Sequence, residues 1–364
     1  EVLAAGHHPA QRRLAFEELL AHQLALRLAK ETLQSAPAAA LRDTRGLEAR
    51  FLGALPFTLT AAQQRALDEV DADLAAARPM MRLVQGDVGC GKTVVAAAAA
   101  ARAVGSGAQA TLMAPTELLA EQHWRSFEAW FRPLGLPVAL VSGSMGARAR
   151  RSALAAIASG EVALIVGTHA LFQEGIEFAR LALVIVDEQH RFGVQQRLAL
   201  QEKGDRRGEA PHQLIMTATP IPRTLAMTAF ADLDLSVIDE LPSGRTPVKT
   251  VTVPEERRAA VVARIEAACR AGRQVYWVCP LIEESDELRW QAAEDTAAQL
   301  AEALPAVRIG LVHGRMPPAK KEQAMAAFKA GRIQLLVATT VIEVGVDVPN
   351  ASLMVIENAE RMGL

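Results

Sequence analysis

The sequence predicts an α/β protein with two parallel sheets covered by helices, one after the other along the chain. Short apolar runs, typical of buried parallel strands, alternate with helical stretches. The alternation breaks once, at the Pro- and Gly-bearing residues 241–247, and then resumes. The length agrees, because 364 residues correspond to two domains at roughly 150 residues each.

The elements follow in chain order from the spacing of apolar residues. Residues 9–35 carry Leu14, Leu20, Leu24 and Leu28 at near-helical spacing, which predicts a long amphipathic connector helix. A loop is expected next, at 36–56. The following apolar runs predict strands at 82–85, 110–114, 138–141, 164–167, 183–186 and 214–217. The stretches between and after them predict helices at 93–103, 117–131, 147–158, 194–202 and 223–231. After the break, strands are expected at 249–253, 274–278, 307–312, 334–338 and 352–356, and helices at 255–271, 291–303 and 318–330.

Three segments are therefore expected: a connector helix and loop at 1–54, a first α/β domain at 55–241 and a second at 242–364. The last segment stops just after a strand, so its sheet is expected to be incomplete, and the chain to be part of a longer protein.

Composition and charge exclude several other classes. With 51% hydrophobic and 22% charged residues, the chain resembles neither disordered nor collagen-like proteins. The net charge of −2 means that nucleic-acid binding would depend on local patches. No apolar run reaches the roughly 18 residues of a membrane span, and no signal peptide opens the chain. Three cysteines without CxxC spacing predict neither a disulfide framework nor a zinc site, so an intracellular, cytoplasmic protein is expected.

The glycine-rich loop at 86–93 (GDVGCGKT) follows a predicted strand and precedes a predicted helix. Gly86, Gly89 and Gly91 let the backbone curl so that its N–H groups point at phosphate oxygens. Lys92 is expected to reach the β- and γ-phosphates, and the Thr93 hydroxyl to bind Mg²⁺. The simpler alternative is an ordinary glycine-rich turn, which the strand–loop–helix context argues against.

Two adjacent carboxylates, Asp187 and Glu188, follow the apolar run at 183–186. They are expected at the carboxyl end of a buried strand, where open α/β sheets bind ligands. Asp187 is the predicted second Mg²⁺ ligand, and Glu188 the residue that orients and polarises the attacking water. A strand that ends in a solvated acidic loop is the alternative. The residues predicted to be catalytic are Lys92, Asp187 and Glu188.

These motifs resemble those of superfamily 2 helicases and translocases, and in finer detail those of the RecG family of bacterial branched-DNA helicases. The resemblance rests on LPFTLTAAQ at 55–63, APTELLAEQ at 114–122, VGTHALF at 166–172, DEQHRFG at 187–193, TATPIPR at 217–223, YWVC at 276–279, VHGRM at 312–316 and ATTVIEVGVDVP at 338–349. It covers nearly the whole chain and implies two tandem RecA-like domains.

The resemblance also implies residue roles. Gln63 is expected to read adenine through its amide. Residues expected to contact DNA, or to couple the nucleotide state to domain closure, are Thr116, Glu117, Thr168, His169, His190, Thr217, Thr219, Gly314, Arg315, Thr339, Thr340, Gly345 and Asp347. For Thr116, Glu117, Thr168 and His169, helix capping is an alternative that is compatible with DNA contact.

The implied activity is ATP-dependent remodelling of branched DNA, such as stalled forks and Holliday junctions, in repair and recombination. ATP and Mg²⁺ are the expected cofactors. Branched DNA, bound without sequence preference by a monomer, is the expected partner, with single-stranded DNA-binding protein as a further one and the nucleoid as the location. The family's amino-terminal wedge and carboxyl-terminal arginine motif are not recognised within the chain, so weak hydrolysis is expected. A transcription-repair coupling translocase, a non-motor P-loop ATPase and a piece that only binds nucleotide and DNA are the alternatives.

Overall fold

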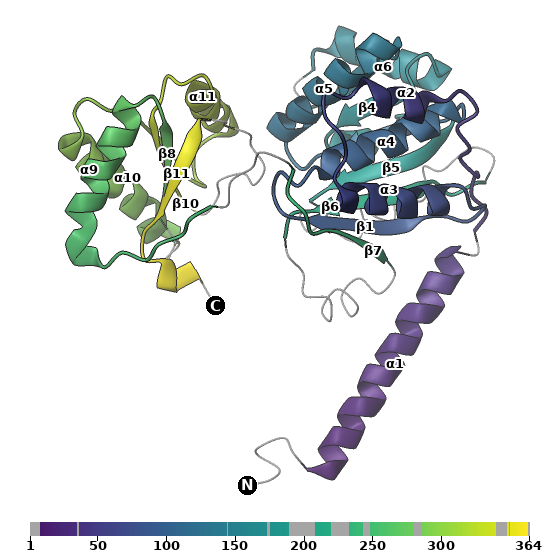
Figure 1. Cartoon of the computed structure of the whole chain (residues 1–364), viewed down its shortest axis with the longest axis horizontal. Coiled ribbons are helices and arrows are strands. Elements are labelled where there is room, and N and C mark those ends of the chain that lie inside the picture. Colours follow the sequence, from purple (N-terminus) through teal and green to yellow (C-terminus); the bar gives the residue numbers. More distant parts are fainter. Residues whose placement is uncertain are drawn as a thin grey trace. The chain divides into compact units, whose positions relative to one another are not determined.

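The fold was analysed in a computed structural model, which describes residues 8–34, 36–143, 145–172, 175–188, 208–219, 233–242, 248–279, 286–339, 348 and 350–362. The chain divides into two compact units, Glu1–Thr246 and Pro247–Leu364, each with a sheet of its own (Figure 1). No helix of the described residues is long and apolar enough to span a bilayer.

Unit 1 is built on a seven-stranded sheet in which every strand pair is parallel. The strand order is β3-β4-β2-β5-β6-β1-β7. The strands are β1 (Met81–Gly86), β2 (Gln109–Met113), β3 (Val138–Val141), β4 (Leu164–Gly167), β5 (Leu181–Asp187), β6 (His212–Thr217) and β7 (Asp234–Ile238). Six of the seven were expected, and β7 was not.

Both faces of this sheet are buried, as the sequence predicts. Successive side chains of a strand point to opposite faces. Val84 and Ile185 accordingly belong to one apolar cluster, and Leu83 and Val184 to another. Burial on both faces explains why the strands read as continuous apolar runs rather than alternating ones.

Five helices in the described part of unit 1 lie against this sheet (Figure 1): α2 (Leu47–Ala54), α3 (Ala61–Leu74), α4 (Lys92–Gly105), α5 (Glu117–Phe131) and α6 (Ala147–Ser159). Unit 1 also contains the helix α1 (Pro9–Gln34), which does not cover the sheet, and the short 3-10 turns η1 (Arg132–Leu134) and η2 (His169–Phe172). The expected helices at 194–202 and 223–231 lie outside the described residues.

The expected loop at 36–56 is partly wrong, because α2 occupies its second half. Phe51 of α2 is buried and stacks on Phe131 of α5, with ring centroids 5.1 Å apart. An eight-residue segment shows too little periodicity to identify, and helices this short owe their stability to tertiary packing.

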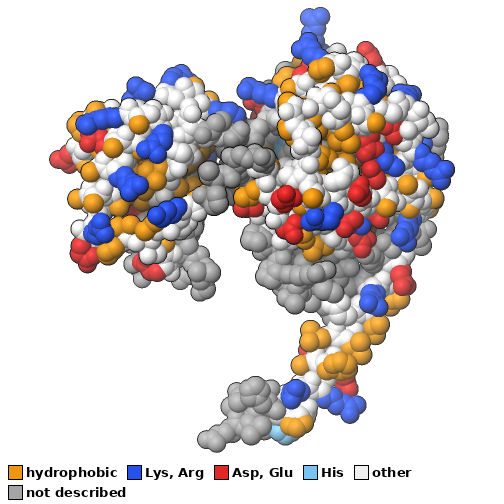
Figure 2. All heavy atoms as spheres, in the orientation of Figure 1, with side chains coloured by type: hydrophobic (Ala, Val, Ile, Leu, Met, Phe, Trp, Pro, Cys, Tyr) orange, Lys and Arg blue, Asp and Glu red, His pale blue; other side chains and the backbone are white. Residues whose placement is uncertain are grey.

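The long helix α1 matches the predicted helix at 9–35. Its large apolar side chains are exposed, and Figure 2 shows hydrophobic side chains along it. They are Leu14, Phe16, Leu19, Leu20, Leu24 and Leu28.

Unit 2 contains a four-stranded parallel sheet in the order β11-β8-β10-β9. Its elements are the 3-10 turn η4 (Glu255–Arg257), α9 (Arg258–Arg270), β8 (Gln274–Cys279), α10 (Asp286–Ala303), β9 (Ile309–Val312), α11 (Pro318–Lys329), β10 (Leu335–Thr339), β11 (Ala351–Ile356) and the 3-10 turn η5 (Ala359–Met362). Trp277 is among its largest fully buried side chains, and Tyr276 packs its ring edge-on against Phe328 of α11.

The strand expected at 249–253 is wrong. These residues have no regular secondary structure, and Val251 and Val253 are 65% and 46% exposed. Alternating Val and Thr favour a strand locally, but a strand also requires a neighbouring strand and a buried face.

Candidate functional site

The carboxyl ends of three neighbouring strands of unit 1 lie at the same level. In the register of the sheet, Asp187 of β5 pairs with Met216 of β6, and Thr217 of β6 pairs with Gln85 of β1. The acidic pair, the Thr217 segment and the phosphate loop therefore follow adjacent strand ends, although they are far apart in sequence. Ligands of open parallel sheets bind at this edge.

The phosphate loop has the backbone that its glycines predict. Gly89 and Gly91 have φ angles of 76° and 92°, a region that other residues rarely adopt. A Cβ atom on Gly91 would also collide with Nε2 of Gln63, and one on Gly86 would collide with Sγ of Cys90. The loop leads directly into α4, which begins at Lys92 and is buried along Val94–Ala101. The helix N-terminus is thus anchored beside the loop, where it favours a bound anion.

Lys92 lies over the loop that precedes it. Its Nζ donates to the carbonyl oxygen of Gly86 at 2.7 Å and to that of Asp87 at 3.1 Å. The ammonium group is therefore held at the position from which a point charge can reach a phosphate that binds in the loop.

Gln63 is buried, with 2% of its surface exposed. Its Oε1 accepts from the backbone N–H of Thr60 as part of a capping box, and its Nε2 donates to the carbonyl oxygen of Cys90 at 2.7 Å. In this structure the amide supports the phosphate loop. Each of these two amide atoms can make a second hydrogen bond, so the reading of adenine by Gln63 stays a prediction.

Glu188 follows β5 with a φ of 52°, unusual for a residue other than glycine. Its side chain is held by the next strand: Thr217 Oγ1 donates to Oε2 at 3.2 Å, and the N–H of Ala218 donates to Oε1 at 3.0 Å. The N–H of Thr219 in turn donates to Thr217 Oγ1 at 3.1 Å. Backbone strain of this kind persists only where surrounding contacts enforce it, and it is frequent in active sites.

Asp187 is bound to a residue that sequence reasoning missed. His123 of α5 places its Nε2 2.7 Å from Oδ2 of Asp187. The available signal was weak: His123 is a polar residue on the otherwise apolar stripe of α5, which also carries Leu119, Phe127 and Phe131.

The predicted DNA-facing residues of unit 1 lie further along the same sheet edge. Thr116 follows β2 and caps α5, because its side chain accepts from the N–H of Leu119 at 3.3 Å. Thr168 follows β4 and is buried, and its Oγ1 accepts from the N–H of Ala170 at 3.4 Å. Capping is therefore observed at both positions, and their contact with DNA stays a prediction. Glu117 and His169 are the first residues of α5 and η2.

In unit 2, the described members of the predicted set follow two neighbouring strands. Gly314 and Arg315 come after β9, and the Gly314 carbonyl accepts from Nζ of Lys321 at 2.8 Å. Thr339 ends β10 and is 3% exposed. His190, Thr340, Gly345 and Asp347 lie outside the described residues, and nothing in the structure bears on them.

The residues at the edge of unit 1 fit a magnesium ion. Among the described residues there is no cluster of three or more His, Cys, Asp and Glu side chains. Magnesium in nucleotide sites is typically held by one or two protein oxygens together with phosphates and water. Asp187 can provide a carboxylate oxygen and Thr93 a hydroxyl, so the donor chemistry matches this ion.

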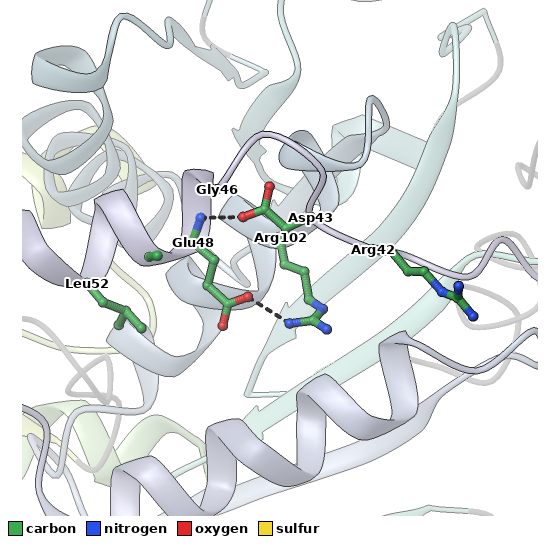
Figure 3. Close-up of a pocket in the computed structure, with 7 residues that line it drawn as sticks. Arg42, Asp43, Gly46, Glu48, Leu52 and Arg102 are labelled. Carbon is green, nitrogen blue, oxygen red and sulfur yellow. Dashed lines mark hydrogen bonds and ion pairs between the residues drawn. The ribbon is translucent and has the colours of Figure 1, made fainter.

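A pocket of about 460 Å³ lies elsewhere on unit 1, between α2 and the end of α4 (Figure 3). There Arg102 binds Glu48 at 2.8 Å and Asp71 at 3.1 Å. Burial, together with the adjacent Glu48, raises the pKa of Asp71 to about 8. Arg102 is ten residues beyond Lys92 on α4, which corresponds to about 15 Å at 1.5 Å per residue, so this pocket is separate from the phosphate loop.

Comparisons with known proteins identify the two domains of the chain. Residues 60–228 match the model of the DEAD/DEAH box helicases, and residues 259–362 match the helicase conserved C-terminal domain. The chain is 62% identical over 366 residues to the ATP-dependent DNA helicase RecG of Escherichia coli K12, and 45% identical over 381 residues to that of Bacillus subtilis. These alignments cover all of this chain but 52% and 54% of the two relatives, so the chain spans about half of their length.

Solved helicase structures have a similar fold. A structure of RecG bound to a three-way DNA junction superposes with a TM-score of 0.84 and 38% identity, over 96% of this chain and 45% of that one. Yeast Dbp5 bound to RNA, at 16% identity and a TM-score of 0.58 over 84% of this chain and 77% of that one, shares the fold alone.

Two RecA-like domains and a phosphate loop beside an acidic strand end define a superfamily 2 helicase motor. Within that class, the chain is similar over its whole length to the RecG helicases, relatives that are named as ATP-dependent.

Proposed function

We propose that this chain is the motor part of an ATP-dependent DNA helicase that remodels branched DNA, such as stalled forks and Holliday junctions, in repair and recombination. The observation that carries the proposal is the alignment of the phosphate loop, Thr217 and Asp187 along one sheet edge. The relatives are DNA helicases and the RecG structure contains a DNA junction, and both facts support the choice of substrate.

The residues of unit 1 divide the chemistry between them. The loop N–H groups and Lys92 are placed to bind the β- and γ-phosphates, and Thr93 and Asp187 would hold Mg²⁺, which would supply positive charge to those phosphates. Glu188 orients the attacking water and accepts its proton, and its link to Thr217 keeps the carboxylate in place. Gln63 is assigned to the reading of adenine on the basis of the family resemblance.

DNA contact is assigned to Thr116, Glu117, Thr168 and His169 in unit 1, and to Gly314, Arg315, Thr339 and Thr340 in unit 2. Hydroxyls, backbone N–H groups and helix N-termini suit contacts to phosphates, which position DNA without reading its sequence. His190, Gly345, Asp347 and Thr219 complete the nucleotide and coupling machinery. A monomeric state, a location at the nucleoid and association with single-stranded DNA-binding protein belong to the same proposal and follow from the family.

The nucleotide part of the proposal can be tested by calorimetry with Mg²⁺–ATP. Lys92→Ala is expected to lose most of the affinity, because it removes a charge from the phosphate site. Lys329→Ala is a matched control, since Lys329 is an exposed lysine at the end of α11. Equal affinities of the wild type and Lys92→Ala would contradict the proposal.

The substrate part requires a comparison of DNA structures. A three-way junction is expected to bind more tightly than a linear duplex of the same length, measured by fluorescence anisotropy at one salt concentration. ATP hydrolysis that is unaffected by any DNA, combined with no DNA binding, would favour a non-motor P-loop ATPase.

A further inference from the structure

One interaction joins the proposed metal ligand Asp187 to α5, the helix that begins with two of the proposed DNA contacts. Nε2 of His123 lies 2.7 Å from Oδ2 of Asp187, and their side chains are 9% and 14% exposed. A short hydrogen bond to a carboxylate, largely shielded from water, is among the stronger polar contacts in a protein.

The fold explains why these two residues meet. β2 and β5 are neighbours in the sheet, and only three residues separate the end of β2 from the start of α5. The buried stripe of α5 faces the sheet, and on it His123 takes a position where the pattern favours an apolar side chain. A polar residue on such a stripe has to find a partner, and here the partner is the residue that ends β5.

We propose that His123 is a positioning residue of the nucleotide site: its hydrogen bond to Oδ2 holds the Asp187 carboxylate in the orientation that binds Mg²⁺. This inference rests on the proposed function, in which Asp187 is a metal ligand. With Oδ2 bound to the imidazole, Oδ1 is the oxygen left to bind the metal or its water.

The same contact ties α5 to the nucleotide site. The first residues of α5, Thr116 and Glu117, are the proposed DNA contacts, and His123 lies about two turns further along the helix. A shift of α5 would therefore move the imidazole that contacts the Asp187 carboxylate. His123 itself is not expected to contact nucleotide or DNA.

Partners that orient a metal-binding carboxylate have a measurable effect: their loss typically lowers metal affinity or activity by about 10- to 100-fold. Removal of His123 is therefore expected to change the dependence of nucleotide binding on Mg²⁺. It is not expected to change binding of the nucleotide without metal, which depends on the loop and Lys92.

The test titrates the whole chain with a fluorescent ATP analogue over a range of Mg²⁺ concentrations. His123→Leu is expected to raise the half-saturating Mg²⁺ concentration about 10- to 100-fold. His123→Gln keeps an N–H donor of similar reach and is expected to stay within a few-fold of the wild type. Phe127→Leu, four residues along the same buried stripe, is the control for a general packing defect.

Further variants keep the test decisive if His123→Leu does not fold. His123→Phe keeps a ring without its hydrogen-bonding nitrogens and is expected to raise the half-saturating Mg²⁺ concentration about 10- to 100-fold in the wild type. In an Asp187→Asn background it is expected to have no further effect, because the carboxylate is already gone. Equal Mg²⁺ dependence of His123→Leu and Phe127→Leu would overturn the inference, as would a His123→Gln variant as impaired as His123→Leu. If the wild type itself shows no Mg²⁺-dependent binding, the proposed function fails instead.

Discussion

The hydroxyl of Thr217 at the end of β6 donates to the carboxylate of Glu188 at the end of β5, at 3.2 Å. Glu188 is 6% exposed and sits in a left-handed backbone conformation. Two donors at the end of β6 thus hold the Glu188 carboxylate. One is the side-chain hydroxyl of Thr217, and the other is the backbone N–H of Ala218. The link connects two motifs that are about thirty residues apart in sequence.

The first prediction concerns this link. Thr217→Val removes the hydroxyl at nearly constant volume and leaves a buried carboxylate short of a donor. A hydrogen bond to a charged group contributes about 1.5–3 kcal/mol, so the free energy of unfolding is expected to fall by an amount in that range. Urea unfolding followed by circular dichroism measures the change.

A double-mutant cycle separates the Thr217–Glu188 contact from other effects of the substitution. Thr217→Val in a Glu188→Gln background is expected to cost less than in the wild type, since the charged partner is absent. Thr217→Ser, which keeps the hydroxyl, is the control. Strictly additive effects would show that the two side chains do not interact.

The second prediction concerns Gly91. Gly91→Ala combines a φ of 92° with a collision against Gln63 and is expected to abolish nucleotide binding. Gly135→Ala is a matched control, because Gly135 has a φ of 78° but nothing within 4 Å of the added Cβ. Both variants are expected to lose about 1–2 kcal/mol from backbone strain. Only Gly91→Ala should lose binding by calorimetry, and full binding by that variant would contradict the role of the loop.

The third prediction follows from the raised pKa of Asp71, about 8 against an ordinary value of 3.8. Between these values the folded protein binds a proton that the unfolded chain has released. The contribution to stability is therefore fully present below about pH 4 and is lost as the pH rises toward 8.

Asp71→Asn removes this titration. As the pH rises from 5 to about 8, the wild type is expected to lose free energy of unfolding that the variant does not lose, so the difference shifts in favour of the variant. Thermal unfolding at a series of pH values measures the difference, with the exposed Asp295→Asn as the control. A constant difference between Asp71→Asn and the wild type across this range would rule out the shifted pKa.

The fourth prediction concerns DNA. If phosphate contacts dominate, the logarithm of the binding constant falls linearly with the logarithm of the salt concentration, by about 0.9 for each phosphate neutralised on duplex DNA. Two duplexes of scrambled sequence should give the same line, since phosphate contacts carry no sequence information. Binding that does not change between low and moderate salt would exclude this mode.

The sequence by itself determined the features that depend on local spacing. Six of the seven parallel strands of unit 1 were readable because burial on both faces favours a continuous apolar run, whereas β7 is only partly buried and was missed. The phosphate loop and the pair Asp187 and Glu188 were readable because their chemistry requires those residues in a fixed order directly after a strand. Their roles in binding and hydrolysis stay predictions.

Only the tertiary structure decided which separate segments meet. Strand order cannot be read from a chain whose strands all look alike, so neither the meeting of Glu188 with Thr217 nor that of His123 with Asp187 was predictable. The short helix α2 exists because Phe51 packs on Phe131, and residues 249–253 are not a strand despite their alternating pattern. The pKa of Asp71 likewise depends on burial next to Glu48, a residue 23 positions earlier in the chain. Contacts over such distances arise from packing, which local propensity does not encode.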